Sequence, residues 1–224
     1  MLFALGHPLS LLVLLVSFVC GVTLHGALQA LVADRLGDRR PRQERRLTLD
    51  PRQHLDPFGA VAAALAGTGW GRPVEPVPRR GRAALVAVTA SGPLANVLLG
   101  IGLLALARSV SGTGLGEGAS FVLQHGVVGL DPLATALLLG GASQLYLGVL
   151  SLVPLPPLDG GRLLFGLAPR TTGWQRAEHL LVEQNGGTVA LLVLLVLPLG
   201  GSVPVLLAVL DAVLAPLLRV LAGV

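Results

Sequence analysis

Apolar and charged positions alternate in long blocks along this chain. Residues 1–33, 83–107, 132–158 and 184–210 contain no Asp, Glu, Lys or Arg. Each block is long enough to supply the roughly 20 apolar residues that a helix needs to cross about 30 Å of hydrocarbon. One such block could be a buried helix of a soluble protein, but four of them in 224 residues indicate a membrane protein.

The blocks predict an all-α membrane protein: a polytopic helix bundle of about five spans that forms a single domain over residues 1–224. The last apolar block is too long for one span, and its Pro198-Leu199-Gly200-Gly201 break favours two short helices. The uncharged segment at 57–71 is too short and glycine-rich for a span, so we expect a re-entrant or interfacial hairpin there. The expected spans cover approximately residues 9–33, 83–107, 133–153, 187–200 and 203–220.

Charge adds an orientation to this picture. Only 12% of the residues are charged, about half the share usual in soluble domains. All sixteen basic residues are Arg, and most lie between the apolar blocks, within residues 34–56, 79–82 and 162–176. The positive-inside rule therefore predicts cytoplasmic Arg loops and an outer N-terminus. The composition, free of Lys and rich in Ala, Gly, Leu and Val, favours a bacterial cell membrane. We expect the lipid bilayer and no nucleic acid as a partner.

Polar side chains within apolar spans are costly, so each of them is a candidate site. His25 and Gln29 share one helix face at spacing i, i+4, and Asp159 follows span 133–153 at the same expected depth. Plainer interpretations exist: His25 bonded to Gln29, Asp159 capping the next helix, and Asn96 satisfying unwound backbone. Asp211, in the last apolar block, stands apart from this group.

Five segments give the chain a family resemblance. In order they read TLHGALQA (23–30), RLTLDPRQHLDPFG (46–59), GWGRPV (69–74), SGPLAN (91–96) and PLPPLDGG (154–161). They resemble the site-2 protease family of intramembrane zinc metalloproteases, in which an HExxH helix and the Asp of an LDG turn bind zinc. The resemblance implies a site-2-protease-like core and a metal-ligand role for His25 and Asp159. It also places Asn96 and Pro154 where a substrate strand is held.

The departures from the family pattern decide the expected activity. Gly26 stands where the family has its general-base Glu, Gln29 where it has the second His, and Ser151 where it usually has Asn. A catalytic zinc site needs three protein ligands, and a general base alone contributes about 10²–10⁴-fold to the rate. The sequence therefore predicts a pseudoprotease without a cofactor, which binds a transmembrane segment of another protein as a regulator or adaptor.

Two alternatives remain open. The first is an active intramembrane zinc metalloendopeptidase with a rebuilt metal site, in which His54 is the third ligand. The second is a small transporter, which has less support because the chain shows no internal repeat and no relay of acidic residues in its spans.

Overall fold

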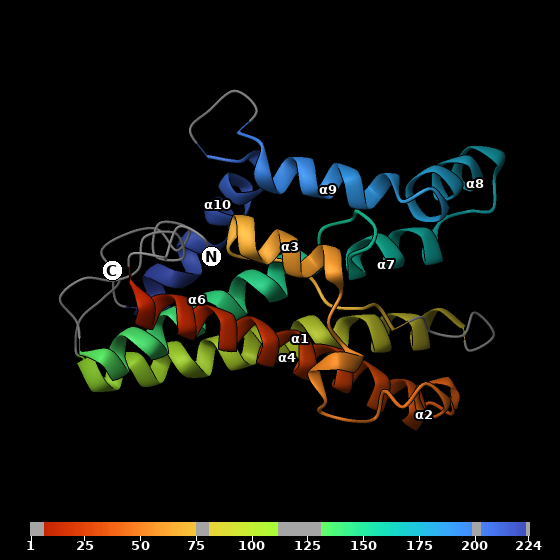
Figure 1. The fold of residues 1–224 in the computed structure, drawn as a ribbon. Helices are drawn as coiled ribbons and strands as arrows, with labels where there is room; N and C mark the ends of the chain where they lie inside the picture. Colours follow the sequence, from red (N-terminus) through yellow and green to blue (C-terminus); the bar gives the residue numbers. More distant parts are fainter. Residues whose placement is uncertain (1–6, 75–80, 112–130, 199–202, 223–224) are drawn as a thin grey trace.

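The computed structural model describes residues 7–74, 81–111, 131–198 and 203–222, and these form helices joined by short loops (Figure 1). In chain order the helices are α1 (Pro8–Arg35), α2 (Arg40–Gln43), η2 (Pro51–Gln53), α3 (Pro57–Ala66), α4 (Gly81–Ser111), α6 (Pro132–Ser151), α7 (Asp159–Leu167), α8 (Thr172–Glu178), η4 (His179–Glu183), α9 (Gly186–Val196) and α10 (Val205–Ala222). In this described part the extended structure is limited to a single bridge between Leu55 and Gly71. The all-α prediction is confirmed.

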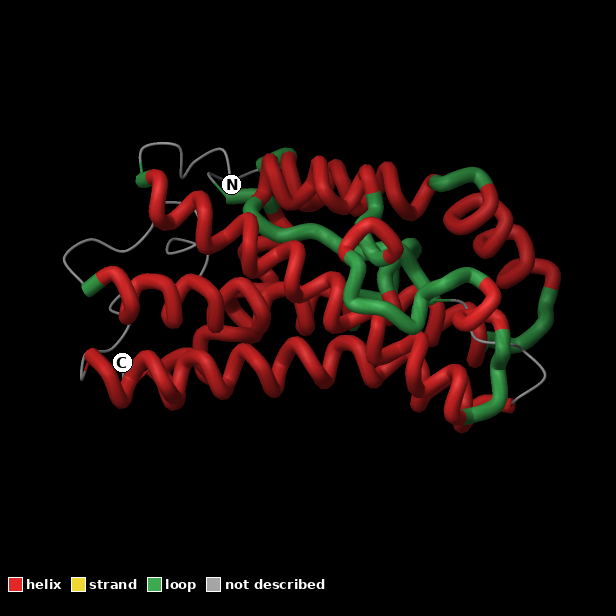
Figure 2. The backbone as a smooth tube through the Cα atoms, turned by 60° about the horizontal axis from the view of Figure 1, so that its bottom comes forward, coloured by secondary structure: helices red, strands yellow, loops and turns green. Residues whose placement is uncertain are grey.

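The three long helices α1, α4 and α6 lie side by side and pack against one another (Figures 1 and 2). Helix α6 is the most enclosed of them, with 78% of its apolar window buried. Glycines allow α4 and α6 to approach closely, because a β-carbon at Gly100 would lie 2.9 Å from the carbonyl oxygen of Gly141. Small residues at helix interfaces serve this purpose in membrane proteins, where van der Waals packing drives association.

Three described helices are long and apolar enough to cross a membrane, or four if α8 with η4 and α9 are counted as one bent span. The first three match the predicted spans 9–33, 83–107 and 133–153 to within two residues at most ends. The fourth and fifth predicted spans are not shown. Helix α9 has eleven residues, about 16 Å of rise, and bends by 66° from the preceding helix pair. The predicted break between them lies largely outside the described residues.

The segment at 57–71 folds back on itself beside α9. Asp56 caps the start of α3 by accepting a hydrogen bond from the Gly59 N–H at 2.8 Å. Gly67 ends the helix at φ 85°, a left-handed conformation that costs glycine little. The bridge between Leu55 and Gly71 then closes the hairpin. The predicted re-entrant or interfacial hairpin stays a prediction.

Asp211, which the family resemblance left unexplained, lies on α10 and accepts a hydrogen bond from the hydroxyl of Tyr146 on α6. Tyr146 is fully buried. A polar contact of this kind between two apolar helices fixes their register, since a carboxylate turned toward lipid would be costly.

Candidate functional site

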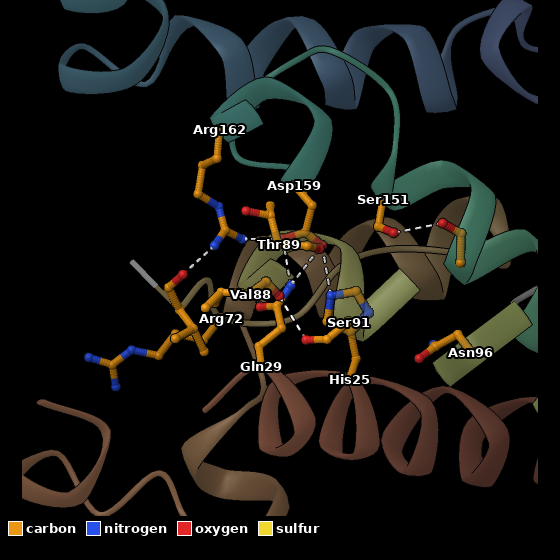
Figure 3. Close-up of polar contacts among 12 residues, drawn as sticks. His25, Gln29, Arg72, Val88, Thr89, Ser91, Asn96, Ser151, Asp159 and Arg162 are labelled. Carbon is orange, nitrogen blue, oxygen red and sulfur yellow. Dashed lines mark hydrogen bonds and ion pairs between the residues drawn. The ribbon is translucent and has the colours of Figure 1, made fainter. Parts of the chain in front are cut away.

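Two helices bring a cluster of polar side chains together. His25 and Gln29 project from α1, and Asp159 begins α7, with Arg162 one turn further on (Figure 3). His25 Nε2 lies 2.7 Å from Asp159 Oδ2, and Gln29 Nε2 donates to Asp159 Oδ1 at 2.8 Å. Arg162 Nη2 lies 2.8 Å from the same Oδ1. Residues 134 and 130 positions apart in the sequence thus meet at one carboxylate.

Both oxygens of Asp159 are engaged, and its side chain is 2% exposed. The amide of Gln29 also donates to the carbonyl oxygen of Thr89 on α4 at 3.2 Å, so it contributes its nitrogen to this cluster. Two of the plainer interpretations are corrected here. His25 and Gln29 each bind Asp159 and form no hydrogen bond to one another, and Asp159 is the first residue of α7, with Leu158 at the cap position. Both oxygens of Asp159 are occupied by side chains, those of His25 and Gln29 on α1 and of Arg162 on α7, which explains both differences.

Glycines surround this cluster at each close approach. A β-carbon at Gly92 on α4 would come within 2.8 Å of His25 Cε1 and closer still to two other ring atoms. At Gly160 a β-carbon would collide with the backbone of Leu152, and at Gly161 with that of Leu155. The glycines of SGPLAN and LDGG are therefore required because the imidazole and the PLPP turn lie directly against these helices.

The ring of His54 fills the space beside Gly26. A β-carbon at Gly26 would collide with His54 Nδ1 and lie 3.2 Å from Cγ. His54 Nε2 lies 2.9 Å from the carbonyl oxygen of Thr48, which can only accept, so Nε2 carries the proton and Nδ1 keeps its lone pair. Nδ1 is buried and has no hydrogen-bond partner. Burial lowers the pKa of His54, opposed in part by the Thr48 hydrogen bond.

Two arginines hold the GRPV segment against the cluster. Arg46, 3% exposed, donates to the carbonyl oxygens of Arg72, at 2.6 Å, and Pro73. Burial, followed by the charge of Arg72, lowers the pKa of Arg46 to about 10. Arg162 Nη1 donates to the carbonyl oxygen of Val74 at 2.6 Å. Arg162 had no predicted role, although its i, i+3 spacing from Asp159 is the spacing of an ion pair on one helix face.

The two residues predicted to contact a bound segment lie in different environments. Asn96 is fully buried, with its Nδ2 3.5 Å from the carbonyl oxygen of Gly21 and its Oδ1 without a partner. Pro154 is exposed and lines an apolar hollow of about 400 Å³ with residues of α7. Ser151 bonds back to its own helix at the Gly148 carbonyl oxygen, 2.7 Å away. Pro154 is therefore the accessible one of the predicted contacts.

The donor set does not fit a catalytic zinc ion. Three protein ligands and one open position are required. His25 and Asp159 supply two donors, while Gln29 presents an N–H and Gly26 has no side chain. Among the described residues, no three His, Cys, Asp or Glu side chains converge as a metal site would need. His54 instead packs against Gly26.

Fold and site together define a helical membrane-type protein whose first long helix meets an LDGG turn through a His–Asp pair. Over 220 aligned residues, the chain is 37% identical to the "Putative zinc metalloprotease YwhC" of Bacillus subtilis (strain 168), covering 94% of this chain and 93% of that protein. The chain belongs to the family of this metalloprotease-like protein. No family model and no solved structure matches the chain.

Proposed function

We propose that this chain is a site-2-protease-like protein of the bacterial cell membrane that has lost proteolytic activity and binds the transmembrane segment of another membrane protein. The order of its motifs supports this assignment. So does the 2.7 Å contact between His25 and Asp159, the two positions that match family ligands. In the proposed orientation the Arg loops lie in the cytoplasm and the N-terminus outside.

The proposal of inactivity rests on the carboxylate of Asp159, since both of its oxygens already have partners within the protein. Gln29 and Arg162 both engage Oδ1, and His25 engages Oδ2. No side chain at position 26 is available to take a proton from an attacking water. Hydrolysis of this type loses about 10²–10⁴-fold in rate when no general base lies within hydrogen-bond reach. With the hydrogen bond from Gln29 to the Thr89 carbonyl oxygen, the polar contacts of the cluster link α1, α4 and α7.

The apolar hollow at Pro154 is the proposed contact for the bound segment. Leu164 and Leu167 of α7 and Trp174 of α8 complete its wall. Both leucines are exposed, and a helix in hydrocarbon can pack there through van der Waals contacts.

Inactivity is tested on the full chain purified in detergent. Zinc content is measured by mass spectrometry of the metal, and cleavage of a transmembrane reporter is assayed with and without a chelator. We expect well below one zinc per chain and no chelator-sensitive cleavage. Stoichiometric zinc together with turnover that a chelator abolishes would overturn the proposal.

Binding is tested with a photo-crosslinking residue at position 154 in the bacterial membrane. Position 12 on α1, whose leucine is 58% exposed, serves as the matched control. We expect one membrane protein to cross-link at position 154 through its transmembrane segment, and not at position 12. Equal labelling at both positions would contradict a specific site.

The second candidate is an active zinc metalloendopeptidase with a rebuilt site. The name of the Bacillus subtilis relative and the unpartnered Nδ1 of His54 favour it. His54 would have to leave Gly26 to act as a third ligand. Separate His54→Ala and Asp159→Ala variants distinguish the two candidates, since both would abolish turnover in an active enzyme.

A further inference from the structure

A second cavity, of about 450 Å³, adjoins the Asp159 cluster. Pro157 and Arg162 line both the cavity and the small pocket around His25. The lining of the cavity comes from α4, α7, α8 and η4 and from the loops between them. Its apolar side chains include Leu85, Pro156, Phe165 and Val182, and its charged side chains are Arg82, Arg162, Arg170 and Glu178. We refer to it as the arginine cavity.

The charges of this cavity leave two arginines available. Arg162 is committed to Asp159 and to the Val74 carbonyl oxygen. Arg82 and Arg170 are exposed, and neither forms an ion pair with any residue in the described ranges. The lining contains one negatively charged side chain, that of Glu178. The lining is therefore net positive.

The first turn of α4 adds to this positive potential. Gly81 and Arg82 of that turn and Leu85 at the start of the next one all line the cavity. The N–H groups of a helix's first turn have no partners within the helix, and they carry the positive end of its dipole. A 31-residue helix brings a full dipole to this position.

The length of α4 places the cavity at the level of lipid headgroups. Arg82 and Arg108 flank its uncharged stretch, and the 26 residue steps between them correspond to about 39 Å. A bilayer with its headgroup regions is about 40–45 Å thick. When α4 spans the membrane, Arg82 therefore lies beside the phosphates of one leaflet.

We propose that the arginine cavity binds the phosphate headgroup of an anionic phospholipid. Guanidinium groups form charge-assisted, often bidentate hydrogen bonds to phosphate oxygens, and basic pockets between membrane helices suit such headgroups. Leu85, Phe165 and Val182 supply the apolar wall that the first part of an acyl chain requires. This proposal holds whether the neighbouring site cleaves, binds or only ties helices together.

The test uses the full chain in detergent, titrated separately with phosphatidylglycerol and phosphatidylcholine. Thermal unfolding is followed by Trp fluorescence, and bound lipid is counted by native mass spectrometry. We expect half-saturation by phosphatidylglycerol at about tenfold lower concentration than by phosphatidylcholine. An Arg82→Gln/Arg170→Gln double variant should lose this preference. Arg176→Gln, which changes an exposed arginine of α8 outside the cavity, should keep it.

Salt gives a second measurement that needs no variant. In about 0.5 M NaCl, where charge interactions are screened, the preference of the wild-type protein should shrink severalfold. An unchanged preference in the double variant, or in high salt, would overturn the proposal. Equal stabilisation by inorganic phosphate or glycerol 3-phosphate would overturn the assignment of a lipid headgroup and indicate a soluble phosphate compound as the ligand. Stronger stabilisation by a Glu-rich peptide would likewise overturn it.

Discussion

The imidazole of His54 lies against the backbone of Gly26 and fills the space that a larger residue at position 26 would need. His54 is fully buried, and its Nε2 is fixed by the Thr48 carbonyl oxygen at 2.9 Å. The position where the resemblance expects a general base is therefore closed by a side chain from the loop after α2. The missing side chain at Gly26 and the ring of His54 are therefore complementary in shape, so a substitution at either position affects the packing of the other.

Gly26→Ala should destabilise the protein by about 1–3 kcal/mol, because the added methyl group overpacks a filled site. The measurement is thermal or denaturant unfolding in detergent, followed by Trp fluorescence. Gly102→Ala is the matched control on α4, since a β-carbon there meets nothing within 4 Å. In a His54→Ala background the cost of Gly26→Ala should largely disappear. An equal cost in both backgrounds would show that His54 is not the obstacle.

Gln29→His should create a zinc site, because residue 29 already reaches Asp159 and the variant adds a third donor beside His25. We expect close to one zinc per chain after dialysis against zinc. Adding Asp159→Asn to the variant should abolish this zinc. The single variant should remain without proteolytic turnover, since Gly26 still offers no base. Zinc binding by the wild-type protein at the same level would contradict the description of the donor set.

Asp159→Asn should destabilise the protein by about 3 kcal/mol, because it leaves the Arg162 guanidinium without its buried counter-charge. Unfolding in detergent measures the loss. The matched control is Glu183→Gln, because Glu183 and its partner His179 have side chains that are 66% and 59% exposed, and we expect little change there. Similar losses of stability at both positions would indicate that burial does not increase the contribution of the Asp159–Arg162 pair to stability.

Stability should fall as the pH drops below about 6.5, the ordinary pKa of histidine, through the titration of His54. Burial is the largest cause of its lowered pKa in the folded protein, and Arg46 lowers it further, while Thr48 and Asp50 act in the opposite direction. The unfolded chain therefore binds more protons than the folded one in this range, so lower pH favours unfolding. The loss levels off once the pH passes below the folded-state pKa.

The check is the unfolding midpoint between pH 7.5 and 5.5 in the wild-type protein and in His54→Gln. The variant should show a flatter dependence. His179→Gln changes a histidine whose side chain is 59% exposed, and it should retain the wild-type dependence. A wild-type slope that persists in His54→Gln would assign the effect to another group.

The sequence by itself determined the helical class and the three long apolar helices, because an uncharged apolar stretch of about twenty residues forms a helix long enough to cross a membrane. It also singled out His25, Gln29 and Asp159, since polar groups inside apolar helices need partners. Only the tertiary structure decided that all three meet Arg162 at one carboxylate, and that His54 closes the space at Gly26. These contacts join segments up to 134 residues apart, and such contacts depend on how helices cross rather than on any local pattern. Helices α8 and η4 had no predicted counterpart, because no apolar run marks them. The predicted helices 187–200 and 203–220 correspond to α9 (Gly186–Val196) and α10 (Val205–Ala222), and packing against α3 and α6 helps to set where these helices end.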